Sequence, residues 1–283
     1  MKRNPHRTQN IAFFFLLVAT LLIVVPVGLI VVIIIQKGLP AINWQFLSDV
    51  PRQGMRAGGI FPAIVGTIYL VTGAIIFALP IGLLAAIYLS EYSKDNPLNR
   101  IIKLAIVNLA GVPSVVYGLF GLALFVVFFK FGASILSGSL TLGIMILPII
   151  ITTSREALES VPQSFREVSL SLGASKWQTI RHIVLPNAIP GILTGTILGL
   201  GRAAGETAPI LFTVAAFYLP QLPKSIFDQA MALPYHLYVI STQVPNVDEK
   251  IRYGTAFVLL ALVLFMNLIA IIIRTRFRKK KKW

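Results

Sequence analysis

Long apolar stretches alternate with short polar segments along the chain. A membrane-spanning helix needs roughly 20 apolar residues at a rise of 1.5 Å each. Six stretches meet this requirement, at about residues 11–35, 63–89, 101–129, 138–154, 190–214 and 254–273. The pattern predicts an all-α integral membrane protein with six transmembrane helices, folded as one domain over residues 1–283.

The first apolar stretch follows three basic residues, Lys2, Arg3 and Arg7, as the core of a signal peptide does. It runs for about 25 residues, whereas the apolar region of a signal peptide has 7 to 15 and precedes a small-residue cleavage site. We therefore expect this stretch to be a retained membrane anchor.

Composition and charge agree with a membrane protein. The chain is 56% hydrophobic and 12% charged, its mean hydropathy is +0.83, and the absence of cysteine excludes thiol chemistry. If the N-terminus is cytoplasmic, the inner segments hold 17 Lys and Arg residues and the outer segments seven. Because basic residues favour the cytoplasmic side, both termini are predicted to be cytoplasmic. The basic tail from Arg274 onward suits anionic membrane lipid, so we expect no nucleic acid partner.

Two long external segments, about 36–62 and 215–253, are rich in Pro, Gly and aromatic residues. Composition leaves two interpretations open for them. They either receive a soluble partner or form interfacial and re-entrant pieces that cap the helix bundle.

The inner segment at about 155–190 is polar and patterned, and it predicts a hairpin of two short helices. Gly173 is placed as a C-terminal stop for the first helix, Ser175 as the N-cap of the second, and Pro186 as its end. The apolar faces of the two helices consist of Phe165, Val168, Leu172, Trp177, Ile180 and Val184. Such faces suit either the membrane surface or a groove in a second protein.

The fifth span contains two charges, Arg202 and Glu206, four residues apart and hence on one helix face. A charge in mid-membrane costs roughly 2.5 to 3.5 kcal/mol on insertion scales, so such residues usually face a partner, a cavity or a pathway. The plain alternative is a salt bridge within the helix. Pro209 lacks an N–H and clashes with the carbonyl of Gly205, so we expect a kink beside the pair.

The chemistry of this pair suits an oxyanion. A guanidinium group presents a planar fork of donors that matches two oxygens of phosphate or sulfate, which favours Arg202 as the anion-binding group. Phosphate near neutral pH keeps a proton that the Glu206 carboxylate can accept, whereas sulfate has none. We hypothesise that the pair selects phosphate over sulfate.

The inner hairpin resembles the EAA loop of ABC importer permeases in its residues and their spacing. The matching positions are Glu167, Gly173, Ile183, Leu185 and Pro186, whereas Val168 and Ser169 replace the two alanines of that pattern. The resemblance implies a type I importer permease fold in which Glu167 bonds to a cleft of a separate ATPase subunit and Gly173 makes the turn. The chain has no G-x-x-x-x-G-K-[ST] motif of its own, so we expect no ATPase site, no catalytic residue and no cofactor, with ATP bound by the partner.

Three further blocks resemble the A-type subunits of phosphate-specific transport permeases: Gly58–Thr67, Gly111–Gly121 and Arg202–Pro209. This resemblance implies that Arg202, Glu206 and Thr207 line a phosphate pathway in a bacterial cytoplasmic membrane. The hydroxyls of Ser114 and Tyr117 either serve the passing anion or only pack the third span. The implied partners are a C-type permease, an ATP-binding subunit dimer and an external phosphate-binding protein.

Other functions remain open. An ABC permease for sulfate, molybdate, phosphonate or another solute would carry the same hairpin, and a secondary transporter or channel would use Arg202 and Glu206 as an ion relay. The hairpin argues against the latter, because such proteins need no ATPase docking site. A membrane enzyme is disfavoured, since His6, His182 and His236 are scattered without metal-ligand spacing, and no metal site is expected.

Overall fold

The protein is described by a computed structural model that covers residues 5–94 and 96–279. The basic residues Lys2 and Arg3 and the end of the basic tail, 280–283, lie outside the described residues. Five helices carry the membrane-spanning stretches: α1 Pro5–Gly38, α3 Phe61–Ile87, α6 Ile135–Glu159, α9 Leu185–Gly205 and α12 Glu249–Lys279. Within the described residues, five helical runs are long and apolar enough to cross a membrane, or six if one strongly bent pair counts as a span.

The bent pair corrects the prediction of one continuous helix over 101–129. This stretch is divided into α4 Pro97–Ala110 and α5 Ser114–Gly121, and a π-helical segment extends α5 to Phe128. The two parts meet at an angle of 102°. Pro113 stands at the corner with an extended ψ of 141°. A proline disfavours helical geometry in the residue before it and donates no hydrogen bond, so the chain turns at this point.

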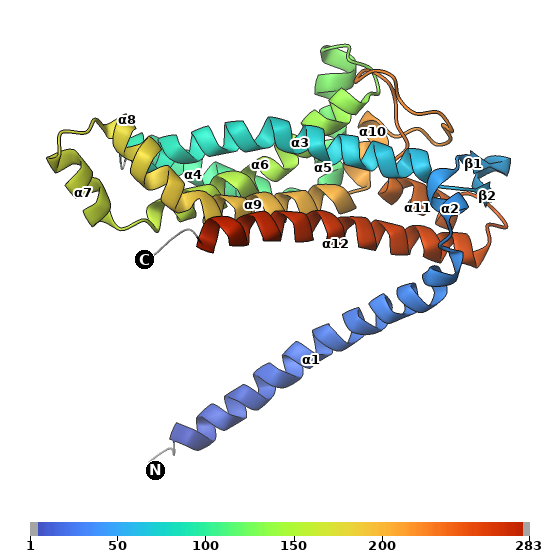
Figure 1. Cartoon of the computed structure of the whole chain (residues 1–283), viewed down its shortest axis with the longest axis horizontal. Helices are drawn as coiled ribbons and strands as arrows, with labels where there is room; N and C mark the ends of the chain where they lie inside the picture. Colours follow the sequence, from blue (N-terminus) through green and yellow to red (C-terminus); the bar gives the residue numbers. More distant parts are fainter. Residues whose placement is uncertain (1–4, 95, 280–283) are drawn as a thin grey trace.

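The centre of the bundle is formed by α3, α6 and α9, with α12 packed along α9 (Figure 1). Close approach of α6 and α9 depends on glycines at every fourth position of α9. A Cβ atom at Gly191 would collide with Ala157, and one at Gly195 would collide with Thr153. This small-residue face lets the two backbones lie in direct contact.

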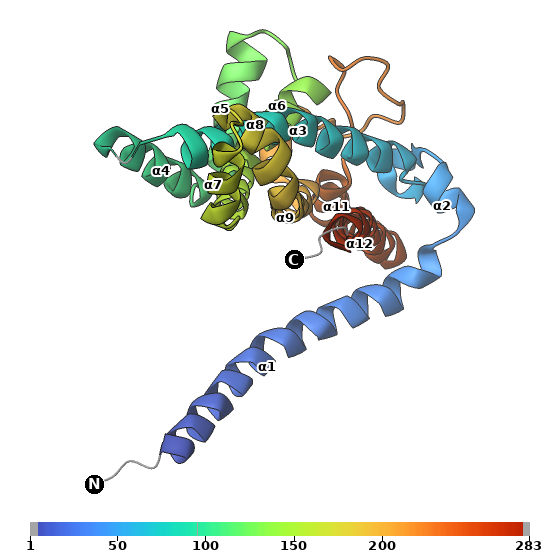
Figure 2. The same cartoon turned by 60° about the vertical axis from the view of Figure 1, so that its left-hand side comes forward.

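Helix α1 extends away from the bundle in both views (Figures 1 and 2). Its contacts with the rest of the chain are near its C-terminal end, where Gly38 meets Tyr253 and Phe257 of α12. None of the most apolar window of this span is buried. Its apolar surface is therefore available to lipid or to another subunit.

The two ends of the bundle differ in structure. One end carries the hairpin of α7 Gln163–Ser171 and α8 Lys176–Thr179, together with the end of α12 that leads to the C-terminus (Figure 1). The other end carries α2 Trp44–Ser48, the short antiparallel strands β1 Pro51–Arg52 and β2 Ala57–Gly58, and α11 Leu233–Thr242. The N-terminal end of α1 points toward the hairpin end in Figure 1, in agreement with both termini on the hairpin side.

Part of the external segment 215–253, from Ala230 to Ile240, packs into the bundle, whereas its first part is an exposed loop (Figure 1). Ala230, Met231, Ala232 and Leu233 are all buried, and the Met231 carbonyl packs where a Cβ at Gly66 would stand. The Leu233 N–H donates a 2.8 Å hydrogen bond to the buried Thr67 hydroxyl of α3. Of the two interpretations left open by composition, the capping role therefore describes this part of the segment.

Candidate functional site

The charged pair of the fifth span lies at a break between two helices. Helix α9 ends at Gly205, Glu206 is extended with φ −77° and ψ 136°, and α10 begins at Ala208 and runs to Thr213. The predicted continuous helix over 190–214 is therefore wrong, and a break replaces the expected kink. Pro209 cannot donate to the preceding turn, and it is favoured in the first turn of a new helix.

Arg202 and Glu206 form the salt bridge that the sequence left open as an alternative. The Arg202 Nε lies 3.5 Å from the Glu206 Oε1, and the two side chains are 29% and 19% exposed. This distance is long for an ion pair, and both groups remain partly accessible. The pair is therefore formed but is not sealed from the surroundings.

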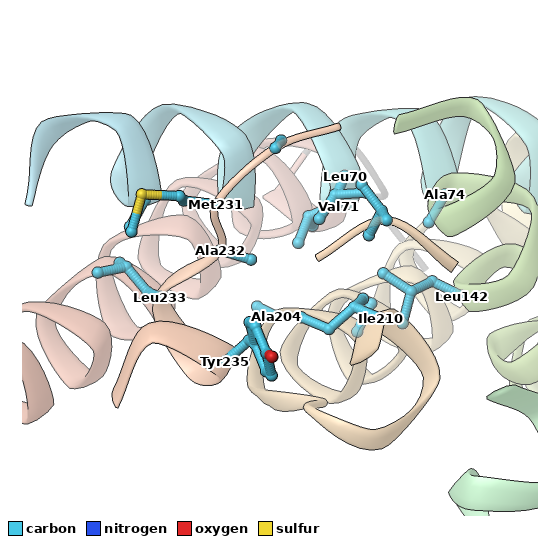
Figure 3. Close-up of a cluster of buried hydrophobic side chains, with 14 of the residues drawn as sticks. Leu70, Val71, Ala74, Leu142, Ala204, Ile210, Met231, Ala232, Leu233 and Tyr235 are labelled. Atoms are coloured by element: carbon cyan, nitrogen blue, oxygen red, sulfur yellow. The ribbon is translucent and has the colours of Figure 1, made fainter. Parts of the chain in front are cut away.

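The break is supported from one side by the packed core. Ala204 before it and Ile210 after it are buried against Leu142 and the α3 residues Leu70 and Val71 (Figure 3). Glu206 lines a small cavity on this side together with Thr67 and Ala232. Because the residues directly before and after the two-residue break are both packed into this core, the position of the break along the span is fixed.

Helix α5 brings Tyr117 and Ser114 toward the same break. A Cβ at Gly118 would stand 2.9 Å from the Ala208 carbonyl, so α5 and α10 are in direct contact. The buried Tyr117 hydroxyl donates a 2.7 Å hydrogen bond to the Leu109 carbonyl across the α4–α5 corner, and it lies within the electrostatic reach of Arg202. Its proton is thus already engaged, while its oxygen can still accept a bond.

The remaining two pathway candidates differ in their surroundings. Ser114 is half-buried at the start of α5, next to the corner at Pro113. Thr207 is half-buried within the break, and its carbonyl accepts from the Leu211 N–H of α10. The structure therefore gathers Arg202, Glu206 and Thr207 at one break and places the α5 hydroxyl groups on the neighbouring helix.

The inner hairpin has the turn that the sequence predicts. Gly173 has a φ of +82°, which side chains disfavour, and it ends the turn that follows α7. Ser175 caps α8 in a capping box with Gln178, in which each side chain bonds to the backbone N–H of the other residue. Glu167 is exposed on α7, and within the described residues its carboxylate makes no hydrogen bond or ion pair.

The apolar residues of the hairpin divide between the bundle and the surface: Ile180 and Val184 are buried with Phe165 packed against their cluster, whereas Val168, Leu172 and Trp177 are exposed. Val168 is 61% exposed, Leu172 83% and Trp177 49%. Exposed large apolar side chains beside an exposed carboxylate are typical of a protein-binding site. The hairpin therefore has the surface expected of a docking element.

The second helix of the hairpin corrects a predicted boundary, because Pro186 does not end it. The helix runs without interruption from Lys176 through the π-helical turn Ile180–Val184 and into α9 as far as Gly205. Ile183 lies in this turn, and Leu185 and Pro186 begin α9. The wider π-helical turn shifts the carbonyl that the proline ring would otherwise meet, so the helix continues.

Sequence reasoning missed the Arg166–Glu91 ion pair, which joins the hairpin to the end of α3. Arg166 Nη2 lies 2.7 Å from Glu91 Oε1, and the side chains are only 12% and 8% exposed. The two residues are 75 positions apart, so no local pattern could have connected them. A further link within the hairpin joins the hydroxyls of Ser169 and Thr179 at 2.9 Å.

Comparison with known proteins agrees with this architecture. Residues 78–283 match the family described as binding-protein-dependent transport system inner membrane component. A probable ABC transporter permease protein of Bacillus subtilis, YqgI, is 34% identical over 90% of both chains. A phosphate transport system permease protein of Mycobacterium tuberculosis, PstA 1, is 36% identical over 77% of this chain and 71% of its own. The PstA protein of Xylella fastidiosa strain Temecula1 is 33% identical over 83% and 81%.

Solved structures with the same fold have low sequence identity. A permease chain of an inward-facing methionine ABC transporter, MetNI, matches with a TM-score of 0.60 at 16% identity, over 77% of this chain and 94% of its own. A bacterial ABC transporter chain involved in import of the polysaccharide alginate matches with a TM-score of 0.63 at 13% identity, over 96% of both chains. The fold, the EAA-type hairpin and the family match lead to one conclusion: this chain belongs to the inner-membrane components of binding-protein-dependent transport systems, the multi-pass permease subunits of ABC importers.

Proposed function

We propose that this chain forms one half of the translocation pathway of an ATP-driven importer for inorganic phosphate. The observation that carries the proposal is the partly exposed Arg202–Glu206 pair at the break between α9 and α10. The relatives named as phosphate transport permeases support phosphate as the substrate.

The pair is suited to passing an anion rather than holding it. Arg202 supplies the charge and the fork of donors that bind two oxygens of phosphate. Glu206 competes for the same guanidinium at 3.5 Å. An incoming anion must therefore displace the carboxylate and does not bind to an unpaired arginine. The carboxylate accepts a hydrogen bond from the phosphate O–H during passage, with the proton staying on phosphate, and pairs again with Arg202 when the anion leaves, which keeps binding weak and reversible.

The surrounding complex follows from the accessible surfaces. The exposed face of the hairpin, with Glu167 at its side, docks into an ATP-binding subunit, which performs the hydrolysis that this chain does not. A second permease of the C type completes the pathway beside Arg202, and an external phosphate-binding protein delivers the anion to the end that carries α2 and α11. ATP is bound by the partner subunits alone, in the cytoplasmic membrane of a bacterium.

The test is uptake of radiolabelled phosphate in cells without their own phosphate transporters, which express this chain together with its neighbouring subunits. We expect uptake that needs ATP, is indifferent to excess sulfate and is lost in Arg202→Ala. Arg202→Lys keeps the charge without the fork and should retain only a minor part of the uptake. Arg155→Ala removes a basic residue at the inner end of α6 and serves as the matched control that keeps uptake.

The alternative is an importer for a different oxyanion. Inhibition of uptake by sulfate, or absence of phosphate uptake in a complex that assembles and hydrolyses ATP, would keep the permease and reject phosphate. Unchanged uptake in Arg202→Ala would instead reject the pathway assigned to this pair.

A further inference from the structure

The Arg166–Glu91 pair is largely buried and held by several hydrogen bonds, unlike an exposed surface ion pair. The Arg166 guanidinium donates to both Glu91 oxygens, with Nε 3.3 Å from each and Nη2 2.7 Å from Oε1. It also donates to the carbonyls of Val161 at 2.7 Å and Leu158 at 2.9 Å. One largely buried side chain therefore joins α7, the end of α6 and the π-helical turn that ends α3.

The second arm of the hairpin reaches the same part of α3. The Lys176 ammonium at the start of α8 lies 4.9 Å from the centre of the Tyr92 ring. Both Glu91 and Tyr92 belong to the π-helical turn Tyr88–Tyr92 that ends α3. In the same turn the Ser90 hydroxyl is buried and has no hydrogen-bond partner among the described residues. Both arms of the hairpin thus contact one irregular turn.

Stability alone gives a weak reason for this arrangement. A buried ion pair is often no more stabilising than apolar packing of the same volume, whereas loss of one partner leaves an uncompensated charge. The pair therefore sets a geometry: α7 cannot move relative to α3 without breaking several charged hydrogen bonds at once. π-Helical turns within helices occur frequently at functional sites.

Helix α3 continues from this turn to the far end of the bundle. There its Thr67 hydroxyl accepts the N–H of Leu233, and Thr67 and Glu206 line the same small cavity. A displacement applied to the π-helical turn therefore reaches the segment that caps the charged break through one packed helix.

We propose that Arg166 and Glu91, here called the coupling pair, carry the movement of the docked hairpin to α3, in addition to its direct continuation into α9. They are positioning residues, because neither reaches the substrate or ATP. The inference rests on the proposed function only in that an ATPase subunit moves the hairpin.

The test exploits the absence of native cysteine in the chain. Glu91→Cys and Arg166→Cys are introduced together, with cysteine-free partner subunits, and the purified complex is reconstituted in vesicles with its binding protein. ATP hydrolysis with and without binding protein is measured before and after treatment with a short bis-methanethiosulfonate cross-linker. Phosphate uptake is measured in the same vesicles. Arg155→Cys with Glu159→Cys is the matched control, because that 3.7 Å pair lies within one helix and connects no separate elements.

The untreated variant should assemble, keep its basal hydrolysis and lose about tenfold of its stimulation by binding protein, and cross-linking should restore most of it. The control pair should keep its stimulation throughout. Wild-type stimulation in the untreated variant, or a loss that cross-linking does not repair, overturns the proposal. If the double variant fails to assemble, Glu91→Gln, which keeps the shape of the side chain, should show the same loss of stimulation without any cross-linking step, and wild-type stimulation in it overturns the proposal. The stimulation of ATP hydrolysis by binding protein is measured separately from phosphate uptake. Absence of phosphate uptake in the wild type would therefore reject phosphate as the substrate but would not contradict the role of the coupling pair.

Discussion

Replacement of Glu206 by glutamine is expected to lower the discrimination of this permease between phosphate and sulfate. In the structure the Glu206 carboxylate stands 3.5 Å from Arg202, so any anion on the guanidinium lies beside a negative charge. Two unit charges 3.5 Å apart interact by about 5 kcal/mol with an effective dielectric constant of about 20, which sets the scale of the repulsion for an anion held at a similar distance from Glu206. Phosphate converts this encounter into a hydrogen bond by donating its proton, whereas sulfate meets only the repulsion.

The size of the effect follows from that one hydrogen bond. A hydrogen bond to a charged group contributes about 1.5 to 3 kcal/mol, which corresponds to a factor of about 10 to 150 in the phosphate-to-sulfate ratio. Glutamine has nearly the same shape but carries an amide that donates to sulfate. The variant should therefore lose most of this factor while its phosphate transport continues.

The assay uses vesicles in which phosphate-loaded binding protein drives the cycle, and the entry of radiolabelled sulfate is compared with that of phosphate. Glu159→Gln is the control, because Glu159 also pairs with an arginine four residues away, at 3.7 Å, but lies at the inner end of α6. An unchanged ratio in Glu206→Gln, with transport intact, would refute the selective role of this carboxylate.

Three further predictions concern the hairpin and the capped outer end. Gly173→Val forces a branched side chain into a φ of +82°, at a cost of about 1 to 2 kcal/mol, so co-purification of the ATPase subunit should fall while Gly173→Asn retains it. Thr67→Val leaves the buried Leu233 N–H without its acceptor, which should lower the free energy of unfolding by about 1 to 3 kcal/mol, whereas Thr67→Ser should retain most of it in thermal denaturation. Burial lowers the pKa of His236 from 6.5 to about 4, so the folded state resists a proton that the unfolded state accepts. The contribution of His236 to the free energy of unfolding should therefore be fully present above pH 6.5 and should fall by up to about 3 kcal/mol as the pH drops to 4. His236→Leu should remove this loss. An equal loss in that variant would contradict the assignment to His236.

The hairpin shows how far local signals reach. Gly173 and Ser175 specify a turn and a cap through their own backbone and their immediate neighbours, so both were predicted correctly. Pro186 was misjudged, because the π-helical turn before it accommodates the ring. The 102° corner at Pro113 was not predicted, and beyond it α5 packs against α10 through Gly118, a contact that no local pattern shows.

By itself the sequence determined the apolar spans, the helix–turn–helix form of the inner hairpin and the four-residue spacing of Arg202 and Glu206, because each depends on residues within a few turns of one helix. The tertiary structure alone decided that the charged span breaks at Glu206, that Thr67 holds the capping segment and that Arg166 meets Glu91. Thr67 and Leu233 are 166 positions apart in the sequence, and Arg166 and Glu91 are 75 positions apart. Helical periodicity fixes which face a side chain occupies but not which helix lies opposite, and that choice is made by packing of the whole bundle.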